Sequence, residues 1–148
     1  VITSAGEQTC KEVARQYGWS EEMIAHYLSM DFPFVRLKRF IEIRSADCMP
    51  LEWMIAYCAL IKGLFYDKDN VEYYADRARH CTIDELHAYK ALIEEKQWDA
   101  PVYGSSLQNV LLEMIDRAKC GLSKQEQEHL VKFERLVNDR HHIFEESK

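Results

Sequence analysis

The sequence predicts a mainly α-helical fold, a helical bundle-like domain with one strand left over. Two observations carry this prediction. After Pro50, apolar residues recur at helical spacing almost to the end of the chain, and Ser or Thr capping residues divide the run into separate helices. Before Pro50, one segment (about 35–44) is rich in β-branched and aromatic residues and is bounded by turn residues. At 148 residues we expect a single domain, 1–148.

Composition and charge narrow the function classes. The chain is 47% hydrophobic and 30% charged, as in an ordinary globular protein. Its net charge of −6 disfavours a protein that coats nucleic acid or an anionic membrane, so we expect no nucleic-acid and no membrane partner. The longest apolar run, 53–61, is far shorter than the ~20 residues of a membrane span. Its 5 cysteines are widely spaced and lack a C-x-x-C pair, which favours reduced thiols and a cytoplasmic location.

The first segment, 9–30, predicts two short helices separated by a turn at Gly18, with Ser20 capping the second. Its expected inward residues are Val13, Ala14, Met23, Ile24 and Leu28. The outline is similar to a helix-turn-helix. Residues 20–30, however, contain no Lys or Arg to meet phosphates and bases. We therefore expect two packed helices that lead into the strand, and a DNA-binding domain over 9–30 is the less favoured alternative.

The strand 35–44 carries charges that a strand does not need for folding. Alternate residues share a face, so Glu42 and Arg44 project side by side, with Lys38 and Phe40, opposite to Arg39, Ile41 and Ile43. One interpretation is a cross-strand salt bridge on a solvated sheet face. The other is that Glu42 holds a divalent cation while Arg44 binds an anion, because magnesium favours carboxylates with phosphate oxygens and the planar guanidinium fits phosphate. Spacing leaves both open.

After Pro50 the sequence predicts helices over 51–140. The helix 51–65 is apolar nearly all round and should be the most buried, and Gly63 near its end either allows a close approach or starts the C-terminal cap. A turn at 67–70 precedes a helix to about residue 80. Capping boxes at 82–85 and 123–126 open two further helices, and 98–104 is expected to be a loop. Ser105 or Ser106 starts a helix that Gly121 ends, and the tail 141–148 is expected to be frayed.

The strand segment also carries a longer motif. Residues 32–47 contain F-P-x-V-R-L-K-R-F-I-E-I-R-x-A-D. This run resembles the strand motif of glutamate–cysteine ligases, particularly those of plants and proteobacteria. The resemblance continues, in the order found in that family, through K-G-L-F-Y-D at 62–67, D-A-P-V-Y-G-S-S-L at 99–107 and A-K-C-G-L at 118–122. Two features depart from the family pattern: Ser45 stands in place of a Gly, and Cys48-Met49-Pro50 stands in place of Gly-Gly-Pro.

The resemblance implies a specific activity and site. The strand would belong to the larger sheet of a glutamine-synthetase-like ligase fold. The enzyme would join glutamate to cysteine at the expense of ATP, through a γ-glutamyl phosphate, with Mg²⁺ as cofactor, in the first step of glutathione biosynthesis. By motif match, Glu42 would be a magnesium ligand, and Arg44 would be the catalytic residue that binds the transferring phosphate. Arg36, Arg39 and Asp47 belong to the motif without an assigned role.

The resemblance covers only the C-terminal part of a family chain, which is several hundred residues long. The chain also begins at Val1 rather than Met, so we expect a fragment that is inactive alone. Its other acidic ligands and most of the glutamate pocket would lie in a missing N-terminal part, and its strand would pair with strands supplied there. The alternative is a helical interaction or regulatory module that keeps a degenerate ligase motif, which the changes at Ser45 and Cys48-Met49 favour.

Overall fold

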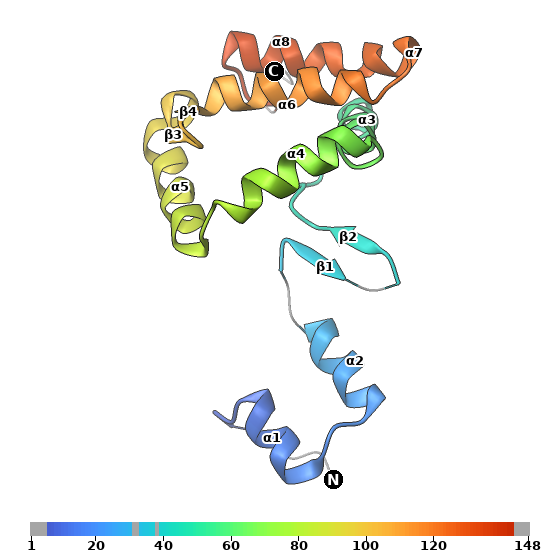
Figure 1. Ribbon diagram of the computed structural model, residues 1–148, viewed down its shortest axis with the longest axis vertical. Helices are drawn as coiled ribbons and strands as arrows, with labels where there is room; N and C mark the ends of the chain where they lie inside the picture. The colour runs from blue at the N-terminus through green and yellow to red at the C-terminus, as the bar shows by residue number, and fades with distance from the viewer. Residues whose placement is uncertain (1–5, 31–32, 38, 144–148) are drawn as a thin grey trace. The chain divides into compact units, whose positions relative to one another are not determined.

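The computed structural model describes residues 6–30, 33–37 and 39–143, and it is mainly helical, as predicted (Figure 1). The chain falls into two compact units, Val1–Cys48 and Met49–Lys148. The boundary lies at the end of the segment that carries the strand motif. The expectation of one domain over 1–148 stays a prediction, and each unit is described by itself below.

The first unit begins with the two short helices that the sequence predicts. Helix α1 (Cys10–Tyr17) opens with a capping box between Thr9 and Glu12, and Gly18 ends it with a φ of 78°. Helix α2 (Glu21–Met30) is capped by Ser20, whose Oγ accepts from the N–H of Met23 at 3.1 Å. The predicted interior of this pair is only partly correct. Ala14 is buried, and Val13 and Met23 are half-buried, but the predicted inward residues Ile24 and Leu28 are 43% and 52% exposed.

The prediction of a single strand over 35–44 is wrong. The segment forms a hairpin of two short antiparallel strands, β1 (Val35–Leu37) and β2 (Ile41–Ile43). The pairs are Val35↔Ile43, Arg36↔Glu42 and Leu37↔Ile41. Residues 39 and 40 form a bend between the strands, so Phe40 does not share a strand face with Glu42 as predicted, and Lys38 lies outside the described residues. The strand therefore has a partner within its own chain.

The second unit is built from helices, whose bounds are α3 (Leu51–Phe65), α4 (Lys68–Arg79), α5 (Ile83–Lys96), α6 (Leu107–Cys120), α7 (Lys124–Gln127) and α8 (Val131–Asp139). The bounds of α3, the Thr82 and Ser123 capping boxes and the Ser106 cap of α6 agree with the sequence prediction. Helix α6 lies between α3 and α8 (Figure 1). The core is formed by α3, α6, the η2 turn (Glu128–Leu130) and α8, around the fully buried Leu130.

Helices α3 and α6 touch through their main chains at Gly63, which is the first of the two roles predicted for this glycine. A Cβ built at Gly63 would lie 2.3 Å from the carbonyl oxygen of Ala118. Asn70, the buried polar residue of this core, donates from Nδ2 to the carbonyl oxygens of Gly63 (3.0 Å) and Arg117 (2.8 Å). This one amide therefore links α3, α4 and α6 at the point of closest approach.

Three predictions for this unit are corrected. Helix α4 begins at Lys68, inside the predicted turn 67–70, because Asp67 caps it. The predicted loop 98–104 includes a short 3₁₀ turn, η1 (Gln97–Asp99), and the strand β3 (Pro101–Val102), which pairs with β4 (Ser105–Ser106). The region after Ser123 is divided into α7, η2 and α8 instead of one helix.

Of the predicted frayed tail, 141–148, the structure describes residues 141–143, and fraying stays a prediction. Arg140 ends α8 in a left-handed conformation, and the N–H of His141 donates to the carbonyl oxygen of Leu136 at 3.0 Å. The His142 ring stacks on Trp98 with 5.5 Å between the ring centroids. Residues 144–148 lie outside the described residues. Across the described part of the chain, every helix is too short or too polar to cross a lipid bilayer.

Candidate functional site

The predicted site residue Glu42 takes part in a cross-strand ion pair with Arg36. The two residues face each other in the β1–β2 register, and Arg36 Nε donates to Glu42 Oε2 at 2.7 Å. Their side chains are 13% and 31% exposed. Directly opposed charges of opposite sign stabilise an antiparallel pair, so this contact helps to fix the register of the hairpin.

Arg36 also closes the end of α2. Its Nη1 donates to the carbonyl oxygens of Leu28 and Ser29, each at 3.3 Å. These are among the last carbonyls of a helix whose own final turn carries no basic residue. A cation at this position satisfies exposed carbonyls and interacts favourably with the helix dipole. One guanidinium therefore joins the hairpin to the helix before it.

Arg44 lies one residue beyond β2. Its main-chain N–H donates to the carbonyl oxygen of Phe34 at 2.7 Å, so the antiparallel pairing continues past the strand. Side-chain alternation then places Arg44 on the same side of the hairpin as Glu42 and Arg36. The structure thus brings the two predicted site residues to one face, and it adds Arg36, to which the sequence assigned no role.

The magnesium prediction can be tested against the residues present. No group of three or more His, Cys, Asp or Glu side chains suited to a metal ion occurs in the described part of the chain. Glu42 supplies one carboxylate, and a guanidinium already occupies its Oε2. Magnesium requires near-octahedral oxygen coordination. The residues described here therefore do not fit a complete magnesium site, and the role of Glu42 as a ligand stays a prediction.

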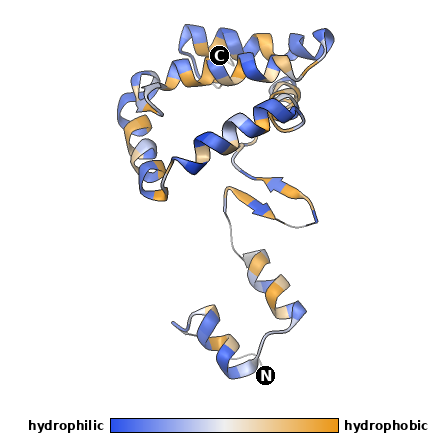
Figure 2. Ribbon diagram, viewed as in Figure 1, coloured by the Kyte–Doolittle hydropathy of each residue, from blue (hydrophilic) through white to orange (hydrophobic). Residues whose placement is uncertain are grey.

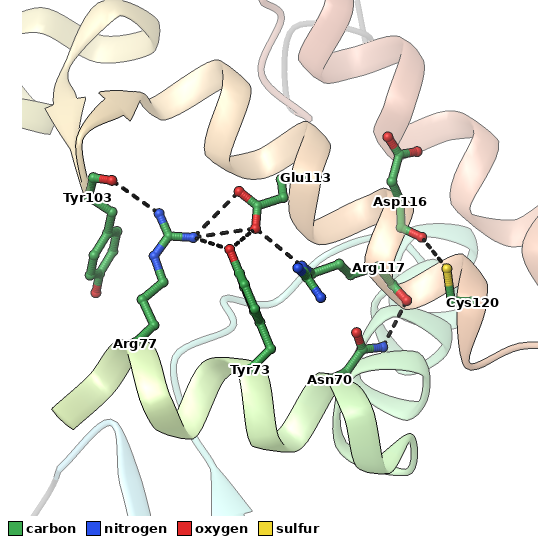
Figure 3. A network of polar contacts seen from close by, with 8 residues as sticks. All are labelled: Asn70, Tyr73, Arg77, Tyr103, Glu113, Asp116, Arg117 and Cys120. Atoms are coloured by element: carbon green, nitrogen blue, oxygen red, sulfur yellow. Dashed lines mark hydrogen bonds and ion pairs between the residues drawn. The ribbon is translucent and has the colours of Figure 1, made fainter. Parts of the chain in front are cut away.

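A second polar cluster lies in the other unit, between α4 and α6 (Figure 3). Glu113 accepts from the hydroxyl of Tyr73, from Arg117 Nε at 3.2 Å and from Arg77 Nη1 at 3.4 Å. The Tyr73 hydroxyl is the largest influence that lowers the pKa of Glu113, and both arginines act in the same direction. Arg117 Cζ also lies 3.2 Å from the centroid of the Tyr73 ring. The charges of Glu113, Arg77 and Arg117 are paired within the cluster, so the cluster links α4 to α6. We call these three residues and Tyr73 the clamp.

The clamp borders a pocket of about 280 Å³ lined by Tyr74, Arg77, Ala78, Tyr103, Val110 and Met114. Arg77 stacks over the Tyr103 ring at 4.7 Å, and its Nη2 donates to the Tyr103 carbonyl at 3.3 Å. Tyr103 holds a positive φ of 51°, which is uncommon for an aromatic residue. Because Arg77 already uses Nη1 and Nη2, the pocket offers apolar contact more than an anion site.

Neither contact network can be predicted from the sequence. Arg36 is one of four Lys or Arg residues in 35–44, and only the hairpin register shows which of them faces Glu42. Glu113, Tyr73, Arg77 and Arg117 follow helical spacing within α4 and α6, but their meeting depends on how the two helices cross. The order of residues along one chain does not show how two helices cross.

Comparison with known proteins gives one consistent family. The chain is 29% identical over 100 residues to the chloroplastic glutamate–cysteine ligase of Medicago truncatula. It is 30% identical over 100 residues to that of Arabidopsis thaliana and 28% identical over 100 residues to that of Nicotiana tabacum. Each match covers 68% of this chain, which spans about a fifth of the length of these curated relatives.

No protein-family model matches the chain, and no solved structure matches it. The larger glutamine-synthetase-like sheet therefore stays a prediction. The relatives do agree with the resemblance carried by the strand motif of residues 32–47. The chain thus contains a partial glutamate–cysteine ligase region.

Proposed function

We propose that this chain is the C-terminal portion of an ATP-dependent glutamate–cysteine ligase. The observation that carries the proposal is the similarity of 100 residues to ligases of this name, together with the strand motif at 32–47. In the proposed reaction, the γ-carboxylate of glutamate attacks the terminal phosphorus of ATP and displaces ADP. The amino nitrogen of cysteine then attacks the acyl carbon, phosphate leaves with the C–O electron pair, and the amine loses a proton.

Within this proposal the hairpin supplies part of the site. Arg44 would bind the phosphoryl group in transfer, since phosphoryl transfer needs positioning and charge neutralisation more than covalent help from the protein. Glu42 would contribute one oxygen ligand to Mg²⁺, and the ion would need its other protein ligands from residues outside this chain. Glutamate, cysteine and ATP are the proposed small-molecule partners. The chain alone is proposed to be inactive, and neither nucleic acid nor a membrane is a proposed partner.

A non-catalytic interaction or regulatory module is the second candidate. The Arg36–Glu42 ion pair favours it, because it uses one of the proposed ligand oxygens within the hairpin. The helix-turn-helix outline of α1 and α2 is present, but the exposed residues Glu21 and Glu22 open α2, which has no Lys or Arg. A DNA-binding role therefore stays the least favoured alternative.

The location in the cell is a proposal as well. All five cysteines are free thiols, which suits a reducing compartment such as the cytoplasm. The names of the relatives place those proteins in chloroplasts.

The test is the intact mass and activity of the native protein. An antibody raised against this chain would be used to isolate the protein from its source cells, and ATP-dependent formation of γ-glutamylcysteine would be measured. The proposal expects a species of several hundred residues, or a stable complex of that size, that forms the product. A lone 148-residue species without activity would overturn the proposal and favour the interaction module. The recombinant 148-residue chain serves as a control, and product formation by that chain would contradict its proposed inactivity.

A further inference from the structure

One face of the β1–β2 hairpin is formed by four aliphatic side chains. The pairs Val35↔Ile43 and Leu37↔Ile41 place them together, while Arg36 and Glu42 point to the opposite side. We call these four residues the apolar hairpin face. Val35, Leu37 and Ile41 are 55%, 74% and 60% exposed, and Ile43 is half-buried. Hydrophobic and hydrophilic positions alternate along both strands (Figure 2).

The opposite side of the hairpin is already in use. Arg36, with its side chain 13% exposed, bonds there to Glu42 and to the last carbonyls of α2. The ion pair and the helix end thus engage the guanidinium of Arg36 on that side. The apolar hairpin face is therefore the side of this hairpin that remains to be covered.

The first unit buries too little apolar surface to be stable by itself. Ala14 is its one buried residue among those described, and Tyr17 and Trp19 are 71% and 59% exposed. An isolated two-stranded hairpin is at best marginally stable in water. A small unit must bury apolar surface to offset the conformational entropy lost on folding. A partner that covers the apolar hairpin face would provide that burial.

The chemistry of the face selects the kind of partner. It has no charge to attract phosphate, nucleic acid or lipid headgroups, so it fits a protein layer that presents apolar side chains. The matched residues make up about a fifth of each of these ligases, so about four-fifths of such a protein lies outside the match. We propose that the apolar hairpin face docks on a polypeptide equivalent to this remaining part of a glutamate–cysteine ligase. This inference rests on the proposed function.

Photo-crosslinking in the source cells tests the partner. The photoreactive residue p-benzoylphenylalanine would replace Leu37 in the natural gene, and a control variant would carry it at the exposed Gln8, outside the hairpin. We expect position 37 to crosslink to peptides similar to the part of the ligases that lies outside the match, at least several-fold more than position 8. Crosslinks to a second copy of residues 1–148, crosslinks to unrelated proteins, or equal yields from both positions would overturn the proposal.

A charge variant provides the second measurement. Leu37→Asp would place a charge in a buried contact, so we expect cleavage of the segment 33–43 by limited proteolysis of the native protein to rise by about 10-fold or more. Gln8→Asp adds the same charge outside the hairpin and should change this cleavage by less than about 2-fold. In the recombinant 148-residue chain both variants should resemble the parent, because Leu37 is exposed there. Equal effects of the two substitutions in the native protein would overturn the docking.

The two proposals fail in different ways. Crosslinks to a ligase-like polypeptide in a preparation that forms no γ-glutamylcysteine would leave the docking standing and remove the proposed function. An active ligase in which position 37 gives no preferential crosslinks would remove the docking and leave the proposed function standing.

Discussion

Arg36 Nε lies 2.7 Å from Glu42 Oε2 across the β1–β2 hairpin, and the same guanidinium reaches the carbonyl oxygens at the end of α2. A residue outside the predicted site thus holds a proposed magnesium ligand in place. It also ties the hairpin to the helix before it. This arrangement separates two questions, how the hairpin is kept folded and whether it takes part in catalysis.

Arg36→Met should loosen the hairpin. It removes the ion pair and the bonds to the end of α2 while keeping much of the aliphatic stem, at an expected cost of about 1–3 kcal/mol. Hydrogen exchange of the amides of 35–37 and 41–43 would show about a 5-fold or greater loss of protection. Arg39→Met, at an exposed position in the bend, is the control. Equal protection in the two variants would contradict the stabilising role of Arg36.

Glu42→Gln and Arg44→Ala should each lower kcat of the native ligase by about 100-fold or more, if these residues neutralise charge in phosphoryl transfer. The measurement is ATP-dependent γ-glutamylcysteine formation, with circular dichroism to check the fold. Near-normal kcat in either variant would remove that residue from the proposed site.

Arg36→Met is the matched control for that experiment, because Glu42→Gln also weakens the hairpin ion pair. If the pair acts only in folding, Arg36→Met, which also removes the bonds to the end of α2, should lower kcat at least as much as Glu42→Gln, and the double variant should lower it no further than Arg36→Met. If Glu42 acts in catalysis, Glu42→Gln should lower kcat much more than Arg36→Met.

Gly63→Ala should destabilise the helical unit by about 3 kcal/mol or more, since the new Cβ would meet the Ala118 main chain at 2.3–2.8 Å. Urea denaturation followed by tryptophan fluorescence is the measurement. The control, Ala88→Ser, also adds one heavy atom, at an exposed position of α5. A shift in midpoint as small as that of the control would contradict the main-chain contact between α3 and α6.

Tyr74→Phe should stabilise the same unit. The Tyr74 hydroxyl is buried without a hydrogen-bond partner among the described residues, and burial is the main cause that raises its pKa to about 12. Removing an unsatisfied buried hydroxyl should gain about 1 kcal/mol near pH 7, again measured in urea.

The effect of Tyr74→Phe should grow with pH. With a folded pKa above the unfolded value of about 10, the stability tied to the neutral hydroxyl is complete below pH 10 and is lost as pH rises toward 12. Tyr73→Phe is the contrasting variant, because its hydroxyl donates to Glu113 and its removal should destabilise. A stability loss in Tyr74→Phe would show that the hydroxyl is satisfied.

Glu126→Gln should make the stability of the fold less dependent on pH in the acid range. The contact with Lys62 is the largest cause that lowers the Glu126 pKa to about 2, followed by its bonds to Ser123. A lowered folded pKa contributes stability above the unfolded value of about 4.3 that is lost as pH falls toward 2. Thermal unfolding between pH 2 and pH 6 is the measurement, and Glu128→Gln in the same segment is the control. Gln can still serve in a capping box, so helix α7 should persist. Parallel profiles for parent and variant would contradict the effect of Lys62.

The helices could be predicted because their signals are local. Thr82 with Glu85 and Ser123 with Glu126 are capping boxes that the sequence shows directly, and the apolar run 51–65 sets the bounds of α3. The hairpin was missed because 35–44 lacks a Gly or Asn at its centre, the usual mark of a tight turn. The composition of 35–44 is therefore compatible with a continuous strand and with a hairpin.

The candidate site, too, could be predicted only where its signals are local. Glu42 and Arg44 could be selected from the motif, and their common side follows from alternation alone. The partner of Glu42 could not, because it depends on which of the neighbouring cations the turn folds back against it. The clamp around Glu113 depends on the crossing of α4 and α6, which is a tertiary property.

The contact at Gly63 also limits which substitutions the chain can accept in evolution. All three atoms nearest to a Cβ at this position belong to the main chain of Ala118, so no substitution of a neighbouring side chain could make room. In a genetic selection for suppressors of Gly63→Ala, we expect reversion or stabilising changes elsewhere in the unit. Position 63 is therefore held to glycine, because the atoms that exclude a side chain there belong to the main chain of α6 and are the same whatever residue stands at position 118.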